Sequence, residues 1–214
     1  MDGTIAGNRV LCNRSFTIKN PIVLITADGR SLLQDLKQWE SLVKDSGLSC
    51  NSHDVYCVAR SYKAIPGRMN HWANVDSSGS KWWAEHLPPN KIYRDTIRHT
   101  HGDVNDKEPG FDVNWDVIGS NYDPRDVRWH GSTSLFAVYT AIAMGYKKLV
   151  LAGSPLDTNG HWYDPPNMQG PQWDGETYRA WLDFAKAKEG KMVKSLSGYT
   201  AQILGEPTSK WLRL

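Results

Sequence analysis

The stretch from Trp129 to Asp164 constrains the fold of this chain more than any other. It contains three hydroxyl residues of the kind that cap helices, Ser132 to Ser134, followed by an apolar run. Gly145 suits the position just after a helix, and Leu149 to Ala152 is typical of a strand buried on both faces. We therefore predict a helix, a buried strand and a polar loop. Ligands of open parallel sheets bind beyond the ends of such strands.

Apolar strands alternate with amphipathic helices along the rest of the chain. Pro21 to Thr26 is an apolar strand, and Ser31 to Asp45 carries apolar residues at helical spacing. Further predicted elements are strands at 54–59, 71–75, 91–99 and 192–196, a helical turn at 81–86, a helix at 176–188 and a short helix or turn at 197–205. This alternation predicts an α/β fold with a Rossmann-like, mostly parallel sheet and helices on both faces.

The length of 214 residues favours one domain. We expect that domain to span residues 21–214, preceded by an arm or hairpin at 1–20. Residues 100–128 are polar and aromatic, contain Gly and Pro, and lack periodicity, so they predict an irregular loop or insertion. Most of the ten tryptophans lie in polar segments. These tryptophans can pack where loops meet the core, with the ring buried and the N–H near solvent. Alternatively, they can form aromatic surfaces on which a sugar or a base stacks.

Charge and composition exclude several classes of binding partner and location. The net charge is +2, which gives no nucleic-acid or membrane-surface signature. No apolar run has the length of a membrane-spanning helix, and the first residues lack the apolar stretch of a signal peptide. The three cysteines have no CxxC spacing, so we expect free thiols and a cytoplasmic location. The spacing of His, Cys and Asp predicts no metal site.

The first candidate site is the turn after the first buried strand, which consists of Asp28, Gly29, Arg30 and Ser31. A turn before a helix offers backbone N–H groups and a positive helix end to an anion. Arg30 can add a bidentate grip on phosphate. The structural alternative is an ordinary turn capped by Ser31.

The second candidate site is the helix start at Ser132 and Thr133, whose hydroxyls can bind phosphate oxygens or merely provide a redundant cap. The loop that ends the central stretch adds His161, a candidate general base because histidine titrates near neutral pH. A solvated histidine is the alternative. In the same loop Tyr163 can donate to a departing phosphate, and Trp162 can stack on a ring.

Two further candidates follow other predicted strands. Arg60 lies at the carboxyl end of the strand at 54–59, and Asp76 lies at the tip of the strand at 71–75. Together with Trp162, we assign them to a sugar or acceptor site.

The central stretch resembles the bacterial lipooligosaccharide sialyltransferases and, more distantly, the archaeal 6-hydroxymethylpterin diphosphokinase-like domains. The closest similarity covers residues 141–148 (AIAMGYKK), the apolar strand into Gly153, the Asn159-Gly160 pair and Tyr163. The turn at 27–32 and the last strand into Tyr199 and Thr200 match more loosely.

This resemblance implies a Rossmann-like sheet that binds a CMP-sugar without a metal, in a protein that can form homo-oligomers. Tyr163 matches a tyrosine that contacts the leaving phosphate, and Asn159 matches the asparagine of the family's loop. Ser132 and Thr133 match residues lining the nucleotide or acceptor site, and Thr200 lies near residues around the base.

The chain also departs from the family. Asp28 replaces an asparagine, and a carboxylate there would repel phosphate but can bind ribose hydroxyls. Asp157 stands where the family has a second phosphate-contacting tyrosine. The family's base histidine lies in a later lid, whereas no histidine follows His161 here. Either His161 or Asp157 would therefore have to act as the base.

We expect a metal-independent, glycosyltransferase-like protein whose partner is a nucleotide or nucleotide-activated (CMP-type) sugar, with no cofactor. One alternative is a non-catalytic nucleotide-binding protein, such as a viral or regulatory remnant of that family. Another is an ATP- and magnesium-dependent diphosphokinase-like enzyme that uses Asp28, Asp76 and Asp157. The last is an interaction module with exposed aromatic residues as its contact surface.

Overall fold

The computed structural model describes residues 2–5, 8–12, 17–75, 95–101, 111–115, 132–170 and 175–213. Its strands are β1 (Asp2–Ile5), β2 (Asn8–Cys12), β3 (Ile22–Thr26), β4 (Asp54–Val58), β5 (His71–Ala73), β6 (Ile97–His101), β7 (Val113–Trp115), β8 (Lys148–Ala152) and β9 (Val193–Ser195). Its helices are α1 (Leu32–Asp45), α3 (Thr133–Met144), α4 (Gly175–Lys186), α5 (Gly198–Leu204) and α6 (Ser209–Arg213), with 3-10 turns η1 (Ser61–Ala64) and η3 (Lys188–Met192).

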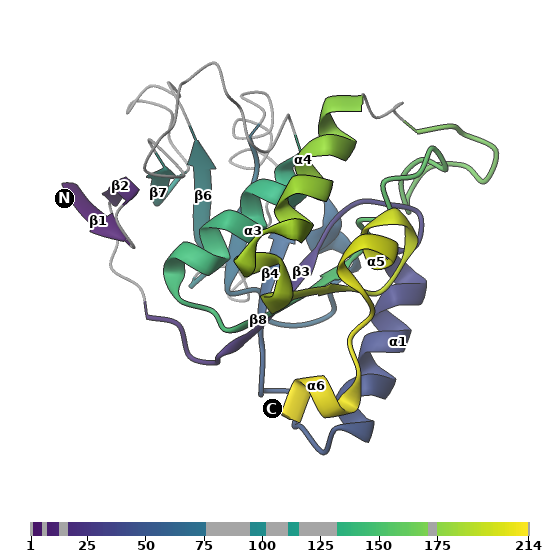
Figure 1. Ribbon diagram of the computed structural model, residues 1–214, viewed down its shortest axis with the longest axis horizontal. Helices are drawn as coiled ribbons and strands as arrows, with labels where there is room; N and C mark the ends of the chain where they lie inside the picture. The colour runs from purple at the N-terminus through teal and green to yellow at the C-terminus, as the bar shows by residue number, and fades with distance from the viewer. Residues whose placement is uncertain are drawn as a thin grey trace.

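The described strands form one sheet in the order β1-β2-β7-β6-β5-β4-β3-β8-β9. From β7 to β9 every neighbouring pair is parallel, whereas the β1–β2 and β2–β7 pairs are antiparallel. The chain moves outward from β3 to β7 and then returns to β8, on the other side of β3 (Figure 1). This reversal creates a topological switch point between β3 and β8, where open α/β sheets bind ligands.

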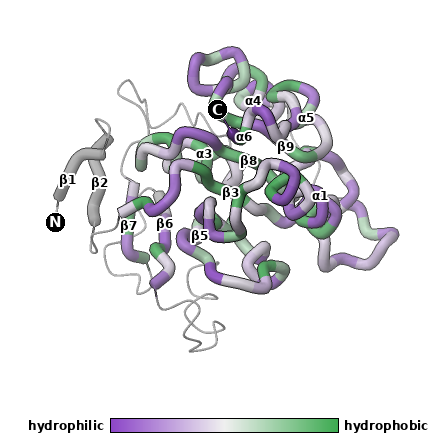
Figure 2. The backbone as a smooth tube through the Cα atoms, turned by 90° about the horizontal axis from the view of Figure 1, so that it is seen from below, coloured by the Kyte–Doolittle hydropathy of each residue, from purple (hydrophilic) through white to green (hydrophobic). Residues whose placement is uncertain are grey.

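Helices cover both faces of the sheet because the central strands are apolar on both sides. Val23 and Ile25 of β3 join the core under α3 and α4, while Ile22 and Leu24 join the core under α1 and α6. Figure 1 shows α3 and α4 in front of the central strands. Hydrophobic stretches at β3 and β8 lie in the middle of the molecule (Figure 2). This double burial is the expected state of a parallel sheet and confirms the predicted fold class.

The segment expected to be irregular, residues 100–128, contains a strand. Val113–Trp115 forms β7, which pairs with β6 and β2. Three residues are too few to show a period, although Val113 and Trp115 are fully buried. Most of the other residues of this segment, and the predicted helical turn at 81–86, lie outside the described residues, so the expected insertion stays a prediction.

The ends of the chain also differ from the expected bounds. Of the two expectations for residues 1–20, an arm or a hairpin, the structure has the hairpin, formed by β1 and β2. The short helix α6 was not expected, and Leu212 anchors it in the α1-side core. Within the described part of the chain, no helix has the length and apolar character needed to cross a membrane.

A chain of hydrogen bonds between buried polar side chains crosses the α3 side of the sheet. Trp115 donates from Nε1 to Nδ1 of His99 (3.1 Å). Nε2 of His99 lies 3.0 Å from Nδ1 of His71, whose Nε2 lies 2.9 Å from the hydroxyl of Tyr146. That hydroxyl donates to the Asp54 carboxylate (2.7 Å). Because an indole N–H only donates, all these bonds can be formed in one direction when both histidines are neutral.

Burial holds these histidines in the neutral form. Desolvation lowers the pKa of His71 to about 4, although the nearby Asp54 carboxylate partly opposes the shift. Desolvation, together with the neighbouring His71, also lowers the pKa of His99 well below its ordinary value. A proton added to either imidazole would place two N–H donors opposite each other, so one hydrogen bond of this network would be lost.

We predict that stability falls in acid because of these histidines. Their pKa values are lower in the folded than in the unfolded state. Their contribution is therefore complete above the unfolded value near pH 6.5 and is lost as pH falls toward 4, at a cost of about 3 kcal/mol for His71. His71→Gln should flatten the dependence of the free energy of unfolding on pH, measured by urea denaturation between pH 4 and 7. Trp115→Phe removes the donor and part of a buried ring but neither histidine, so it should lower stability with the slope retained. A wild-type slope in His71→Gln would contradict this account.

Candidate functional site

The switch point between β3 and β8 holds a cavity of about 230 Å³, here called the switch-point pocket. Its walls come from the turn after β3, the end of β4, the N-terminus of α3 and the loop after β8. Predicted site residues that line it are Asp28, Gly29, Ser132, Thr133, Asp157 and His161. The structure therefore brings together predicted site residues that lie far apart in the sequence, at 28–29 and at 132–161.

The floor of the pocket is a continuation of the β3–β8 pairing. The N–H of Ala27 donates to Ala152 O and the N–H of Gly29 donates to Gly153 O, each over 2.8 Å. A Cβ on Gly29 would lie 2.4 Å from Cδ of Pro155, so the two turns approach too closely for a larger residue. The Gly29 N–H, which we expected to face an anion, is used in this pairing.

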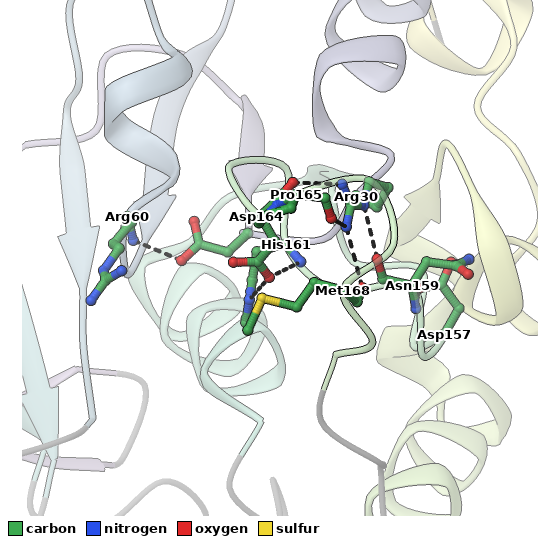
Figure 3. Close-up of polar contacts among 9 residues, drawn as sticks. Arg30, Arg60, Asp157, Asn159, His161, Asp164, Pro165 and Met168 are labelled. Carbon is green, nitrogen blue, oxygen red and sulfur yellow. Dashed lines mark hydrogen bonds and ion pairs between the residues drawn. The ribbon is translucent and has the colours of Figure 1, made fainter.

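Arg30 binds the loop after β8. Its Nε donates to Asn159 O (2.8 Å), Nη1 donates to Asp164 O (2.8 Å), and Nη2 donates to Pro165 O (2.9 Å) and Met168 O (3.3 Å) (Figure 3). The planar guanidinium can satisfy several carbonyls at once. We expected a phosphate grip, but in this arrangement Arg30 is engaged with the loop.

His161 is paired with Asp164 in that loop. Oδ2 of Asp164 lies 2.8 Å from Nδ1 of the His161 ring and also accepts the His161 backbone N–H (2.8 Å) (Figure 3). The backbone bond is the main reason why the pKa of Asp164 lies below its ordinary value. Because a carboxylate only accepts, Nδ1 carries the proton and Nε2 is the basic nitrogen. The sequence interpretation missed Asp164, although its position three residues after His161 was a usable signal.

Asp28 has an unusual environment for a carboxyl group. Oδ2 accepts the Arg60 backbone N–H (2.9 Å), while Oδ1 is buried and accepts no hydrogen bond of standard geometry from the described residues. The Trp162 indole N–H, which is likewise buried and unsatisfied, still favours the ionised form. Burial raises the pKa of Asp28 to about 6, against the opposing effects of Arg60, His161 and Trp162. Asp28 can therefore exchange a proton near neutral pH, a property that favours acid–base chemistry in a cleft.

At the N-terminus of α3, Ser132 fits the cap interpretation. Its hydroxyl oxygen accepts the Leu135 N–H (3.3 Å) and the Trp181 indole N–H (3.2 Å), and the residue is buried. Thr133 and Ser134 are only half-buried and line the pocket. The first turn of a helix also leaves N–H groups without intrahelical partners, so this wall can bind an anion.

Three predicted residues hold loops in place. Asp157 accepts the backbone N–H (3.0 Å) and the side-chain amide (2.8 Å) of Asn159, so both residues are engaged in one turn. Thr200 is fully buried and donates to Ser154 O (2.7 Å), behind the pocket wall rather than in it. These contacts position the loop.

Ser31 precedes α1, yet its side chain makes no capping bond. Its hydroxyl donates to Asp35 (3.0 Å) and lies 2.8 Å from the hydroxyl of Ser197. Ser31 therefore joins the turn after β3 to the turn after β9.

The predicted sugar or acceptor residues lie at the rim or elsewhere. The Arg60 guanidinium lies 5.2 Å from the centre of the Tyr163 ring, which stacks on His161 (5.1 Å, 1°) and is 38% exposed. Trp162 packs against the α1-side core, and its backbone N–H donates to Asp28 O (2.9 Å). Asp76 lies outside the described residues.

A larger cavity of about 1000 Å³ lies between α1 and residues 65–70. Leu36, Trp39, Val55 and Ile65 contribute to its mainly apolar lining. It contains none of the predicted site residues, and it lies away from the carboxyl ends of β3 and β8. Fold position and chemistry therefore favour the smaller switch-point pocket.

No family model, curated protein or solved structure matches this chain. In the part of the chain that the structure describes, no three His, Cys, Asp or Glu side chains form a group that could hold a metal ion. The resemblance to sialyltransferases thus stays a prediction.

We predict that Arg30→Lys loosens the loop after β8, because a lysine ammonium cannot reach four carbonyls with the geometry of a guanidinium. Amide hydrogen exchange over residues 157–170 should become faster while exchange in β3 and β8 is retained. The matched control is Arg68→Lys at an exposed position. Wild-type exchange in the loop of Arg30→Lys would show that these four bonds do not order it.

We predict that Gly29→Ala destabilises the protein by about 2–3 kcal/mol, because the added Cβ collides with Pro155 and the Gly153 carbonyl. Gly67→Ala is the matched control, since nothing lies within 4 Å of its added Cβ. Urea denaturation of both variants measures the difference. Equal stability of the two variants would contradict the close approach of the two turns.

Proposed function

We propose that the switch-point pocket binds a nucleotide-activated, CMP-type sugar and transfers the sugar to an acceptor hydroxyl without a metal ion. The observation that carries this proposal is the His161–Asp164 pair beside the N-terminus of α3, at the switch point of the sheet. It supplies a base and an anion-binding wall in one place. The resemblance of residues 141–163 to sialyltransferases supports the choice of a CMP-sugar over other activated sugars.

In the proposed reaction, the acceptor hydroxyl oxygen attacks the anomeric carbon, and the bond from that carbon to the phosphate oxygen breaks. Nε2 of His161 takes the hydroxyl proton, and CMP leaves with the bonding electron pair. The Asp164 carboxylate stabilises the imidazolium that forms. The transition state resembles an oxocarbenium ion, as in other glycosyl chemistry. We assign the base role to His161 alone, because Asn159 occupies both oxygens of Asp157.

The leaving phosphate would be stabilised mainly by dipoles. The first-turn N–H groups of α3 and the Thr133 hydroxyl are the donors of the pocket wall. Tyr163 at the rim is a further donor, because burial raises its pKa and keeps the phenol protonated. Preorganised donors of this kind stabilise developing negative charge without a metal.

The size of the pocket favours a second candidate, a protein that binds a nucleotide without transferring a sugar. The cavity of about 230 Å³ lies below the range of roughly 300–1,000 Å³ that is usual for small-molecule sites. It would hold part of a nucleotide more readily than a complete nucleotide-sugar.

We predict that the protein releases CMP from a CMP-sugar in the presence of an acceptor and in excess chelator. Asp164→Asn, which removes the charge that orients His161, should slow release by about 10²–10⁴-fold. His161→Ala should abolish release while the affinity for CMP changes by less than a few-fold. Gln169→Ala, exposed in the same loop, is the control. Chromatographic detection of CMP measures turnover, and thermal shift measures binding.

The same assays separate the alternatives. Binding of CMP without turnover supports the nucleotide-binding protein. A thermal shift only with ATP plus magnesium supports a diphosphokinase-like enzyme. No shift with CMP, UDP or ATP would remove the nucleotide site and favour an interaction module.

A further inference from the structure

The charges of the switch-point pocket are unfavourable for a phosphate. Its titratable lining residues are two carboxyl groups, Asp28 and Asp157, and one histidine, His161. Among the described residues that line the pocket, none is Lys or Arg. An anion that enters therefore meets carboxylates as well as the helix dipole, unless a carboxyl group is neutralised.

Asp28 is the carboxyl group that can be neutralised at low cost. Its Oδ1 is enclosed without a hydrogen-bond partner, so the ionised form is poorly solvated. The charged and titratable groups around it are Arg60 and Cys57 at the end of β4, and His161 and Tyr163 in the loop after β8. Burial against the sheet raises its pKa to about 6, which agrees with this geometry.

We propose that a phosphate-bearing nucleotide binds in the switch-point pocket together with one proton, which Asp28 takes up from solvent. Ionised Asp28 disfavours any anionic ligand, so the bound nucleotide and the Asp28 proton enter and leave the pocket together. This proposal rests on the proposed function and specifies the ligand, a nucleoside phosphodiester with a single negative charge.

The consequence concerns release of the product. Sugar transfer converts a phosphodiester with one negative charge into a phosphomonoester with about 1.5–2 negative charges at neutral pH. The added charge develops in the pocket that Asp28 lines. Return of the Asp28 proton to solvent sets the ionised carboxylate against the product and favours departure of the nucleoside monophosphate. In acid, neutral Asp28 holds the product, and product inhibition increases.

Binding must also show the reciprocal effect. A bound negative charge stabilises the protonated form of Asp28, so affinity rises as pH falls through about 6. Asp28→Asn removes the charge, yet its amide oxygen can still accept the Arg60 N–H. The variant should therefore behave at every pH as the wild type does in acid.

Isothermal titration with cytidine 5′-(methyl phosphate) tests this, because the phosphate group of the probe keeps a single negative charge between pH 5 and 8. Wild type should bind the probe about tenfold more tightly at pH 5 than at pH 7.5. Asp28→Asn should show no such slope and should bind at pH 7.5 as tightly as the wild type at pH 5. It should also be inhibited more strongly by CMP at pH 7.5. Titration of the wild type in two buffers of different ionisation enthalpy should show net proton uptake near pH 6.5, without any variant.

Several results would overturn the proposal. The first is a pH dependence of affinity that persists in Asp28→Asn but is lost in His161→Gln. The second is weaker or unchanged binding of the probe by Asp28→Asn at pH 7.5. The third is no proton uptake by the wild type. Binding without a slope overturns this proposal and leaves sugar transfer intact. Proton-linked binding without turnover supports this proposal and removes sugar transfer. No binding at any pH overturns both.

Discussion

The pairing of β3 with β8 continues beyond both strands, and the whole candidate site depends on it. Ala27 and Gly29 donate backbone hydrogen bonds to Ala152 and Gly153 (2.8 Å each), so the two turns run side by side. The missing side chain of Gly29 allows Pro155 to approach within contact distance. A switch point in a parallel sheet normally opens into a crevice. Here the same backbone pairing closes its floor and leaves a small pocket above it.

The candidate base is positioned by backbone contacts that start from this floor. His161 forms an isolated β-bridge with Gly29, and the N–H of Trp162 donates to the carbonyl of Asp28 (2.9 Å). Arg30 then joins the far part of the loop to the turn after β3. Two segments more than a hundred residues apart in sequence are therefore joined by several hydrogen bonds, as is needed to hold a base at a fixed distance from a substrate.

The sequence predicted what depends on local pattern. The apolar runs at β3 and β8 predicted the buried sheet, and parallel strand ends share one edge, so the proximity of Asp28 and His161 followed. The sequence could not predict that Arg30 binds the carbonyls of the loop after β8. Hydrophobic periodicity carries no information on which distant backbone segment lies beside a given guanidinium. The short strand β7 escaped notice, since its three residues lie in a polar segment. The raised pKa of Asp28 depends on burial of its carboxyl group, which only the packed structure shows.

Some buried polar side chains of this protein are fully hydrogen-bonded, whereas others at the candidate site are not. Along the line from Trp115 to Asp54, each buried group has a partner, so the network specifies one arrangement of β5, β6 and β7 at little cost. At Asp28 one oxygen is enclosed and unpaired, which destabilises the ionised form. The Trp162 indole N–H, in the loop that contacts the turn of Asp28, is likewise buried without a hydrogen bond. An unpaired acceptor and an unpaired donor thus lie together at the switch point, which favours a role of this place in binding or chemistry over a role in stability.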